Sequence, residues 1–447
     1  MKSRHIAVVG SGISGLSAAW LLSQKHRVTL IEADNRPGGH SNTVDCEVNG
    51  VEVSVDTGFI VYNPPAYPNL TALFRHLGVP TAPSNMSFSV SMGNGAYEYA
   101  GSGIAQLVGQ ARNLVSPGHW RLIRDIPRFF STAMARLPHL GETVTIGQFL
   151  EAEGYSRHFM DRHLLPMAGA IWSAAPGDMR DYPARAFLSF FHNHGLLKIT
   201  GRPLWRTVKG GSREYVSRLI RDGAFETRLR TPVAAIRRHA AGVTVHAASG
   251  EERSYDDVVI ATHADQALAM LADASPEERR LLSAFRYSRN RAILHRDERL
   301  MPRRRRLWSS WNYMSELPPH SGTTSAVTYW MNRLQPIPVQ APLFVSLNPL
   351  IGPGADKILA EFDYAHPIFD PAALAAQDEL WLLQGVRRTW FCGAHFGAGF
   401  HEDGIQSGLA VAEALGGVRR PWSVANESGR IRLAPEHAGR TIQEAAE

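Results

Sequence analysis

The chain has little cysteine, no long apolar run and no recognisable export signal. Cys46 and Cys392 are its only cysteines, which excludes a disulfide framework and favours a reducing compartment. No stretch approaches the roughly 20 apolar residues of a membrane-spanning helix. The apolar run at the N-terminus is too short for a signal peptide and leads directly into a glycine turn. We therefore expect a cytoplasmic protein.

Acidic residues are also outnumbered, since the formal net charge is +6. Residues 279–306 hold eleven arginines and two acids, and end in Arg303, Arg304, Arg305 and Arg306. One interpretation is a solvated face. The other is a patch for anionic lipid headgroups, which would place the protein peripherally at the inner face of a membrane. No recognition helix accompanies the arginines, so we expect no nucleic-acid partner.

The first forty residues predict a βαβ unit. Apolar residues at 6–9 and 28–31 are typical of buried parallel strands. The segment 13–25 between them has apolar residues at helical spacing. At 447 residues with 44% hydrophobic and 20% charged residues, the chain is long enough for such a unit to be one domain of two or three.

The turn after the first strand carries a phosphate-binding pattern. Gly10 permits the tight turn, Gly12 lets the backbone approach a pyrophosphate, and Gly15 lets the helix pack on the strand. Ser14 lies in the first helical turn and belongs to the same predicted site. Glu32 ends the second strand, where it can bind the ribose hydroxyls of an adenosine. This acid argues against NADP, because it would repel the 2′-phosphate.

The sequence RPGGH follows, with Arg36, Gly38, Gly39 and His40. It resembles the R-x-G-G signature of FAD-containing oxidoreductases of the amine oxidase and phytoene desaturase superfamily. The resemblance implies that Arg36 and the two glycines lie along the pyrophosphate and the flavin. Many members have arginine or lysine where this chain has His40, so the group that touches the flavin edge stays open.

Two later segments complete the resemblance to an FAD site. In residues 210–268, the position of Val233 implies a backbone hydrogen bond to the adenine, and Thr262 follows a strand that ends beside the cofactor. Near the C-terminus, Gly393 ends the last strand, and a glycine-rich turn leads into a helix.

The resemblance points the N-terminus of this last helix, with Gly404 and Ser407, at the flavin, where it would stabilise negative charge. Many relatives have an acid where this chain has Ala394. Either Glu402 or Asp403 replaces that acid, or the ribitol contact is lost. No motif demands a covalent flavin, although Cys392 or a histidine could form one.

The chain as a whole is similar to a narrower bacterial group, often encoded beside cyclopropane-fatty-acyl-phospholipid synthases. The similarity rests on GAIWS at 169–173, GGSREYV at 210–216, SWNY at 310–313 and GFHEDG at 399–404. It implies an FAD-dependent oxidoreductase acting on acyl chains of membrane lipids, by desaturation for example.

The resemblance also implies a fold class. It is an α/β, Rossmann-like, discontinuous FAD-binding domain joined to an α+β substrate domain of antiparallel sheet and covering helices. We assign residues 1–65, 206–285 and 385–420 to the first domain. Residues 66–205 and 286–384 form the second, and 421–447 a loosely held polar tail.

In the substrate half we predict helices at 105–114, 120–137 and 146–153, and strands around 326–334 and 342–348. Eight aromatic residues there could line an acyl tunnel, although core packing explains most of them. These are Trp172, Phe187, Phe190, Phe191, Trp311, Tyr313, Tyr329 and Trp330.

Desaturation needs a base as well as a hydride acceptor. His401 and Glu402 are the first candidates, followed by Tyr313 and His194. Glu402 could instead cap the helix that follows it. The histidines show no metal-binding spacing, so we expect no metal site. Two other classes remain open: an amine oxidase, and a non-redox flavoprotein such as an isomerase or a lipid-binding scaffold.

Overall fold

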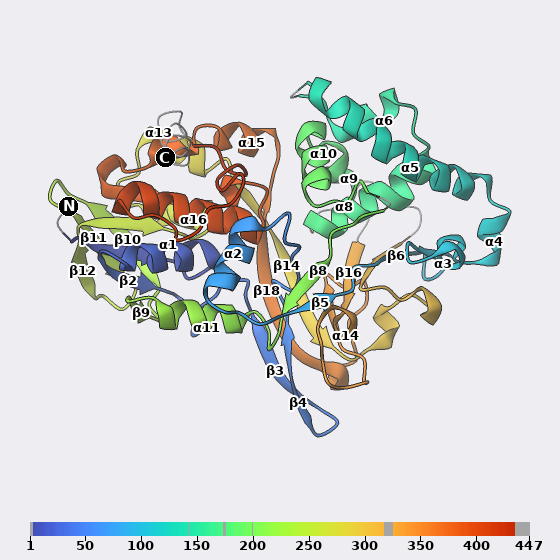
Figure 1. Ribbon diagram of the computed structural model, residues 1–447, viewed down its shortest axis with the longest axis horizontal. Helices are drawn as coiled ribbons and strands as arrows, with labels where there is room; N and C mark the ends of the chain where they lie inside the picture. The colour runs from blue at the N-terminus through green and yellow to red at the C-terminus, as the bar shows by residue number, and fades with distance from the viewer. Residues whose placement is uncertain (1–2, 142, 173–175, 199, 317–324, 434–447) are drawn as a thin grey trace.

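The computed structural model describes residues 3–141, 143–172, 176–198, 200–316 and 325–433. Figure 1 shows two parts side by side, joined by the long strands β14 and β18. The part at the left contains both described ends of the chain, and the part at the right contains most of the middle.

A parallel sheet forms the centre of the first part. All its neighbouring strands pair in parallel, with β1 between β13 and β2. These strands are almost wholly buried because helices and loops cover both faces. The order across the sheet is β19 (Thr389–Phe391), β13 (Asp257–Ile260), β1 (His5–Val9), β2 (Arg27–Ile31) and β9 (Glu226–Arg228).

Helices α1 (Ile13–Ser23) and α16 (His401–Gly416) pack closely against each other. A Cβ atom on Gly408 would lie 2.2 Å from the Ser14 carbonyl oxygen, and one on Gly404 would lie 2.8 Å from Cγ2 of Ile13. Glycine at both positions is therefore needed for the two helices to approach. This contact joins the N-terminal and C-terminal segments into one domain.

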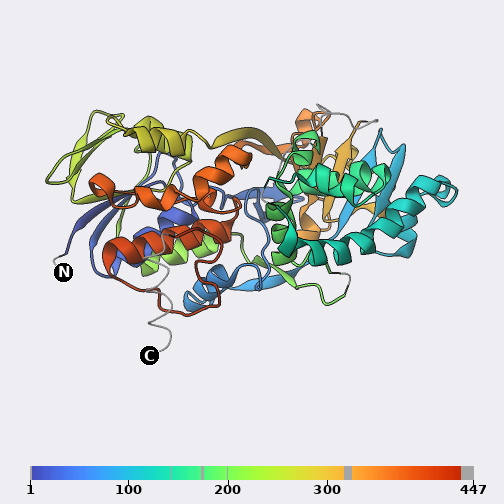
Figure 2. The same cartoon turned by 90° about the horizontal axis from the view of Figure 1, so that it is seen from above.

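Other elements complete this first part, which Figure 2 shows from above. A three-stranded antiparallel sheet of β10, β11 and β12 lies in it, with helices α11, α12 and α13. Their bounds are β10 (Val233–Arg238), β11 (Val243–Ala247), β12 (Glu252–Tyr255), α11 (Arg213–Asp222), α12 (Ala264–Met270) and α13 (Pro276–Leu282).

The second part is built on a seven-stranded sheet. Its neighbours pair antiparallel except for β15 and β6, which are parallel. The order is β18 (Ile358–Ile368), β14 (Arg286–His295), β17 (Phe344–Leu347), β16 (Ser325–Trp330), β15 (Trp311–Ser315), β6 (Phe88–Met92) and β7 (Tyr97–Ala100). Helix α14 (Met331–Leu334) follows β16.

Helices accompany this sheet, and two small two-stranded sheets lie between the parts (Figure 1). The helices are α3 (Ile104–Val108), α4 (Ala111–Leu114), α5 (Pro117–Arg136), α6 (Ile146–Ala152), α7 (Arg157–Phe159), α8 (Leu165–Trp172), α9 (Pro176–Arg180) and α10 (Ala184–Asn193). The first is a hairpin of β3 (Thr43–Val48) and β4 (Val51–Asp56), and the second pairs the distant strands β5 (Thr81–Ser84) and β8 (Trp205–Val208) antiparallel.

The structure corrects several boundaries. The predicted helix 105–114 is two helices, because Gly109 takes a φ of +73° between them. The predicted strand 326–334 ends at Trp330, where α14 begins. Helices α2 (Pro68–His76) and α15 (Pro371–Gln377) fall in the predicted substrate ranges, but they pack on α16 and α13 of the first part.

The predicted loose tail is also wrong where it is described. Arg430 forms a buried ion pair with Asp403 at 2.6 Å, and the indole of Trp422 stacks on that of Trp20 with centroids 5.7 Å apart. Residues 421–433 therefore belong to the packed first part. Residues 434–447 lie outside the described residues.

Candidate functional site

A cavity of about 1530 Å³ is lined by both parts of the molecule. Pockets for a single small ligand are typically about 300–1,000 Å³, so this one has room for a cofactor and a substrate together. At one end it is lined by the residues that follow the parallel strands, including Gly10, Glu32, Thr262 and Gly393. The carboxyl edge of an open α/β sheet is where ligands are expected.

The first glycine turn has the geometry of a phosphate site. Gly10 takes a φ of +100°, and a Cβ on Gly15 would lie 1.9 Å from the Gly10 carbonyl oxygen. A Cβ on Gly12, in contrast, would meet no protein atom within 4 Å. Gly12 is the N-cap of α1 and lines the cavity, so the open space beside it faces a helix N-terminus, where anions are stabilised.

Glu32 stands next to this turn. Its carboxylate accepts hydrogen bonds from the backbone N–H and the hydroxyl of Ser11, at 2.8 and 2.5 Å. It lines the cavity, as does Ser14 in the first turn of α1. The acid is therefore placed within reach of a nucleoside whose phosphates occupy the glycine turn.

The second glycine pair lines the cavity, whereas Arg36 does not. Gly38 and Gly39 take φ values of +112° and +55° and line the cavity, as His40 does. The side chain of Arg36 is not among the lining residues. Its guanidinium lies 3.8 Å from Asp34, beside the solvent. The structure thus places the Arg36 side chain outside the lining of the cavity.

The two later segments reach the same cavity. Val233 and Thr262 line it, as do Gly393, Ala394 and His401. Cys392 does not line it, and burial raises the pKa of its thiol. The thiolate form, which a covalent link to the flavin would need, is therefore disfavoured.

Glu402 and Asp403 do not contact the cavity, which corrects two predictions. Glu402 is fully buried and accepts hydrogen bonds from the backbone N–H groups of Asn69 and Leu70, at 3.0 and 3.1 Å. It thus caps α2, and not its own helix. Asp403 accepts the Phe400 N–H at 2.8 Å and pairs with Arg430.

Gly404 and Ser407 also serve packing. Gly404 lies against α1, and Ser407 accepts a hydrogen bond from the Gly393 N–H at 3.0 Å. Neither lines the cavity, so the two residues fix the turn and helix whose exposed end, at Phe400 and His401, does. The sequence located the helix and His401 at its start, but it misplaced Gly404 and Ser407 beside the cofactor.

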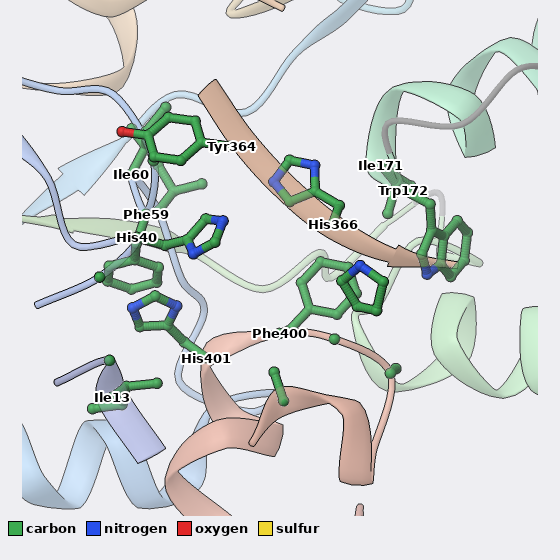
Figure 3. A pocket seen from close by; sticks show the side chains of 18 of the residues that line it. Ile13, His40, Phe59, Ile60, Ile171, Trp172, Tyr364, His366, Phe400 and His401 are labelled. Carbon is green, nitrogen blue, oxygen red and sulfur yellow. The ribbon is translucent and has the colours of Figure 1, made fainter. Parts of the chain in front are cut away.

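Neutral histidines gather in the middle of the cavity (Figure 3). His40 stacks on Tyr364 with centroids 5.0 Å apart and lies 5.4 Å from His366. His401 stacks on Phe59 at 3.8 Å. Burial lowers the pKa of His40 well below its usual value, that of His366 to about 4 and that of His401 to about 3. All three rings are therefore uncharged near neutral pH.

Two of the four predicted catalytic residues line the cavity, His401 and His194. The His401 Nε2 atom is 3.0 Å from the Ser41 hydroxyl. The His194 Nδ1 atom is 3.0 Å from the Phe190 carbonyl oxygen, which can only accept, so Nδ1 carries the proton and Nε2 is left as an acceptor. Nε2 is buried and has no hydrogen-bond partner in the part of the chain that the structure describes. Tyr313 lies inside the core of the seven-stranded sheet, away from the cavity, so that prediction fails together with Glu402.

The tunnel candidates divide equally. Trp172, Phe190, Trp311 and Tyr329 line the cavity, whereas Phe187, Phe191, Tyr313 and Trp330 do not. Apolar residues of three helices line a further part of the cavity, which the sequence did not reveal and which we call the apolar arm. The arm is lined by Leu107 of α3, Ile123, Ile126 and Phe130 of α5, and Met167 and Ile171 of α8.

Signals for these missed residues exist in the sequence. Ile123, Ile126 and Phe130 are three and four residues apart on α5, which places them on one face. Tyr364 and His366 are two apart on β18, so both side chains point to the same side of the sheet. The sequence did not show which other elements pack opposite these faces of α5 and β18.

Several buried polar atoms in the cavity lining lack a hydrogen-bond partner among the described residues. The Nε2 atoms of His40, His194 and His395 have no partner among the described residues, and all three rings line the cavity. Together with the open space at Gly12, they fit a large polar cofactor beside the sheet. Within the described ranges, no group of three or more His, Cys, Asp or Glu could hold a metal, and no helix has the length and apolarity to cross a bilayer.

Comparisons with known proteins agree with this geometry. Residues 13–333 match the family described as flavin containing amine oxidoreductase. An L-amino-acid oxidase from Bungarus fasciatus is 49% identical over 53 residues, 12% of this chain and 10% of that protein. The chain thus matches only about a tenth of the length of that relative.

Solved structures are similar over nearly the whole chain. A putrescine oxidase bound to putrescine has a TM-score of 0.67 at 15% identity, covering 93% of this chain and 99% of its own. A fatty acid isomerase from P. acnes that produces CLA has a TM-score of 0.64 at 15% identity, covering 91% and 97%. At such identities the likeness shows the fold alone, which is that of the amine-oxidase-like FAD-binding proteins.

Proposed function

The chain belongs to the family of flavin-containing amine oxidoreductases and has FAD as its cofactor, and we propose that it removes hydride from a fatty-acyl chain of a phospholipid. The reaction we favour is desaturation of an unsaturated, methylated or cyclopropane acyl chain. When bound, FAD supplies the two-electron acceptor, which dioxygen or another oxidant regenerates. The bound lipid would lose a hydride from one carbon and a proton from its neighbour, leaving a double bond.

The apolar arm is the observation that carries this proposal. It is lined by aliphatic and aromatic side chains of α3, α5 and α8. Such a wall offers no hydrogen bonds, so a polar substrate that entered it would lose its hydration without compensation. An acyl chain, in contrast, gains about 0.8 kcal/mol for each CH₂ group it buries.

The charges around the cavity weigh against a cationic amine. Among the described residues, Glu32 is the only carboxylate in the lining, and it lies at the glycine turn. The histidines near Phe400 are uncharged. A buried ammonium group would therefore lack a carboxylate partner at the substrate end.

His194 is our choice for the base. Its proton is fixed on Nδ1 by the Phe190 carbonyl, and the ring stacks on Phe190 at 3.9 Å. The free Nε2 can take a proton from a carbon held in the cavity. Burial lowers the pKa of His194 to about 3, so Nε2 is unprotonated before the substrate arrives, and the loaded site must stabilise the imidazolium for the ring to act as a base.

The test is anaerobic reduction of the flavin in the holoprotein. We would mix it with phospholipids carrying unsaturated, methylated or cyclopropane chains, and separately with a panel of primary amines, and follow flavin absorbance. Bleaching by one of the lipids alone is the expected result. Bleaching by amines alone would move the protein to the amine oxidases. A shifted double bond without bleaching would indicate an isomerase.

Two variants sharpen this test. Ile126→Trp should block the arm and exclude long chains while short-chain lipids still react. His194→Phe should retain FAD but reduce it slowly, as a missing general base costs about 10²- to 10⁴-fold. His192→Phe, which alters an exposed histidine in the last turn of α10, two residues before His194, is the matched control. If His194→Phe reduced FAD at the normal rate, the base would be another residue.

A further inference from the structure

The surface of α3, α4 and the start of α5 exposes large apolar side chains. Ile104 is 87% exposed, Val115 84%, Leu114 53% and Trp120 47%. These are four of the ten large apolar side chains that are exposed among the described residues, and they fall within 17 positions of sequence. Figures 1 and 2 both place these helices at the end of the molecule farthest from the parallel sheet. We call these four residues the apolar tip.

The apolar tip is held in a fixed shape. Gly109 packs so closely on β7 that a Cβ there would lie 2.1 Å from the Glu98 carbonyl oxygen. The indole N–H of Trp120 donates to the Leu114 carbonyl oxygen at 2.8 Å, and Ser116 caps α5. The exposure of these side chains therefore follows from an ordered backbone.

Basic side chains surround the tip. Residues 101–124 contain no Asp or Glu, and Arg112, Arg121 and Arg124 on this stretch are exposed. Arg306, from the arginine run, donates to the Gly109 carbonyl oxygen at 2.8 Å in the turn between α3 and α4. Arg306 is thus attached to the turn that joins the two helices carrying Ile104 and Leu114. A surface that combines cations with aliphatic side chains and tryptophan fits the interface of an anionic bilayer.

Helices α3 and α5, which carry part of the apolar tip, also line the apolar arm. Leu107 of α3 and Ile123 and Ile126 of α5 line the cavity. An acyl chain that leaves a bilayer at this surface therefore has only one layer of helices to pass before it reaches apolar lining. The membrane-facing side and the substrate-binding side belong to one structural unit.

We propose that the apolar tip and its arginines dock on a bilayer rich in anionic phospholipid, from which the substrate enters. A second copy of the chain is a poorer occupant, because a two-fold contact through this surface would bring the same arginines together. The entry of substrate from the bilayer rests on the proposed function. The docking itself does not, since binding to vesicles is measured without turnover.

The experiment is co-sedimentation of the holoprotein with vesicles of phosphatidylcholine, with and without phosphatidylglycerol. Binding to the anionic vesicles is expected, with loss at high salt. Ile104→Ser with Val115→Ser should weaken it at least about tenfold, because both side chains would otherwise enter the interface. The matched control is Ile351→Ser with Leu382→Ser, which are 52% and 63% exposed elsewhere.

A second pair of double variants tests the contribution of the arginines to vesicle binding. Arg112→Ser with Arg121→Ser should weaken binding roughly tenfold or more at low salt, as each basic side chain near the surface contributes about fivefold. Arg279→Ser with Arg289→Ser removes the same charge from exposed positions outside the tip and should have a much smaller effect. FAD content reports folding of each variant.

Three results would overturn the docking proposal: no binding of the unaltered protein to anionic vesicles, equal losses in test and control pairs, or a dimer that the Ile104 and Val115 changes dissociate. Failure of the proposed function looks different. In that case vesicles still bind through the tip, but lipid dispersed in detergent does not bleach the flavin.

Discussion

Replacing Gly12 by alanine should have opposite effects on cofactor binding and on the stability of the cofactor-free protein. Gly12 has a φ of −63° and a ψ of 176°, which alanine adopts readily, and its Cβ would meet no protein atom within 4 Å. In the apoprotein the change should therefore stabilise the fold by about 0.4–1 kcal/mol, because it restricts the unfolded chain.

The new methyl group would occupy the space at the N-terminus of α1 that the pyrophosphate needs. Losing one backbone hydrogen bond to a charged phosphate costs about 1.5–3 kcal/mol, which corresponds to roughly 10- to 150-fold weaker FAD binding. Gly15→Ala should behave differently. Its Cβ would lie 1.9 Å from the Gly10 carbonyl oxygen, so α1 must move, at a cost of about 1–3 kcal/mol or more in the apoprotein itself.

FAD affinity is measured by titrating apoprotein and following the quenching of flavin fluorescence, and stability by thermal unfolding of the apoproteins. Gly352→Ala is the control, since its Cβ also meets nothing and Gly352 lies outside the cavity. The assignment of the phosphate turn would be refuted if Gly12→Ala bound FAD as tightly as the unaltered protein. If Gly15→Ala left the apoprotein as stable as before, that result would also count against the assignment, because the close packing of Gly15 on Gly10 would then be wrong.

Three further changes test the residues that the sequence misplaced or left open. Glu402→Gln should destabilise the protein by about 1–3 kcal/mol, because its amide N–H₂ would face a backbone N–H at α2 that now donates to the carboxylate. Urea unfolding measures this free energy, and an inactive but fully stable variant would restore a catalytic role for Glu402. Arg430→Gln should cost about 3–5 kcal/mol by leaving Asp403 buried and unpaired, and unchanged stability would show that the last described segment is dispensable. The pKa of His194 is lowered to about 3 by burial, so below pH 6.5 the unfolded chain binds a proton that the fold does not, and stability falls as pH falls toward 3. His194→Phe should remove about 1.4 kcal/mol per pH unit from that dependence, and an unaltered slope between pH 4 and 6 would mean that His194 is protonated in the fold.

The residues of the two glycine turns could be predicted because their task is local. Gly10, Gly38 and Gly39 take positive φ values, which only glycine adopts easily, and Gly15 must let a helix approach its own preceding strand. Such requirements depend on a few neighbouring residues, and they leave a pattern that can be recognised in the sequence.

The side chains around the last helix could not be predicted in the same way. Glu402 and Asp403 stand in the motif that the sequence placed beside the flavin, yet they turn to α2 and to Arg430. Position on a helix fixes which face a residue occupies, but not which element covers that face. Asn69 is 333 residues from Glu402, so no local pattern relates them.

The sequence by itself predicted the parallel strands and the two glycine turns, since these follow from periodicity and from backbone conformations that only glycine permits, and its motifs resembled those of the family. Tertiary structure alone decided which histidines share the cavity, where the apolar arm runs and which face of α3–α5 is left uncovered. Each of these depends on surfaces brought together across hundreds of residues, and their complementarity exists only once the chain has folded.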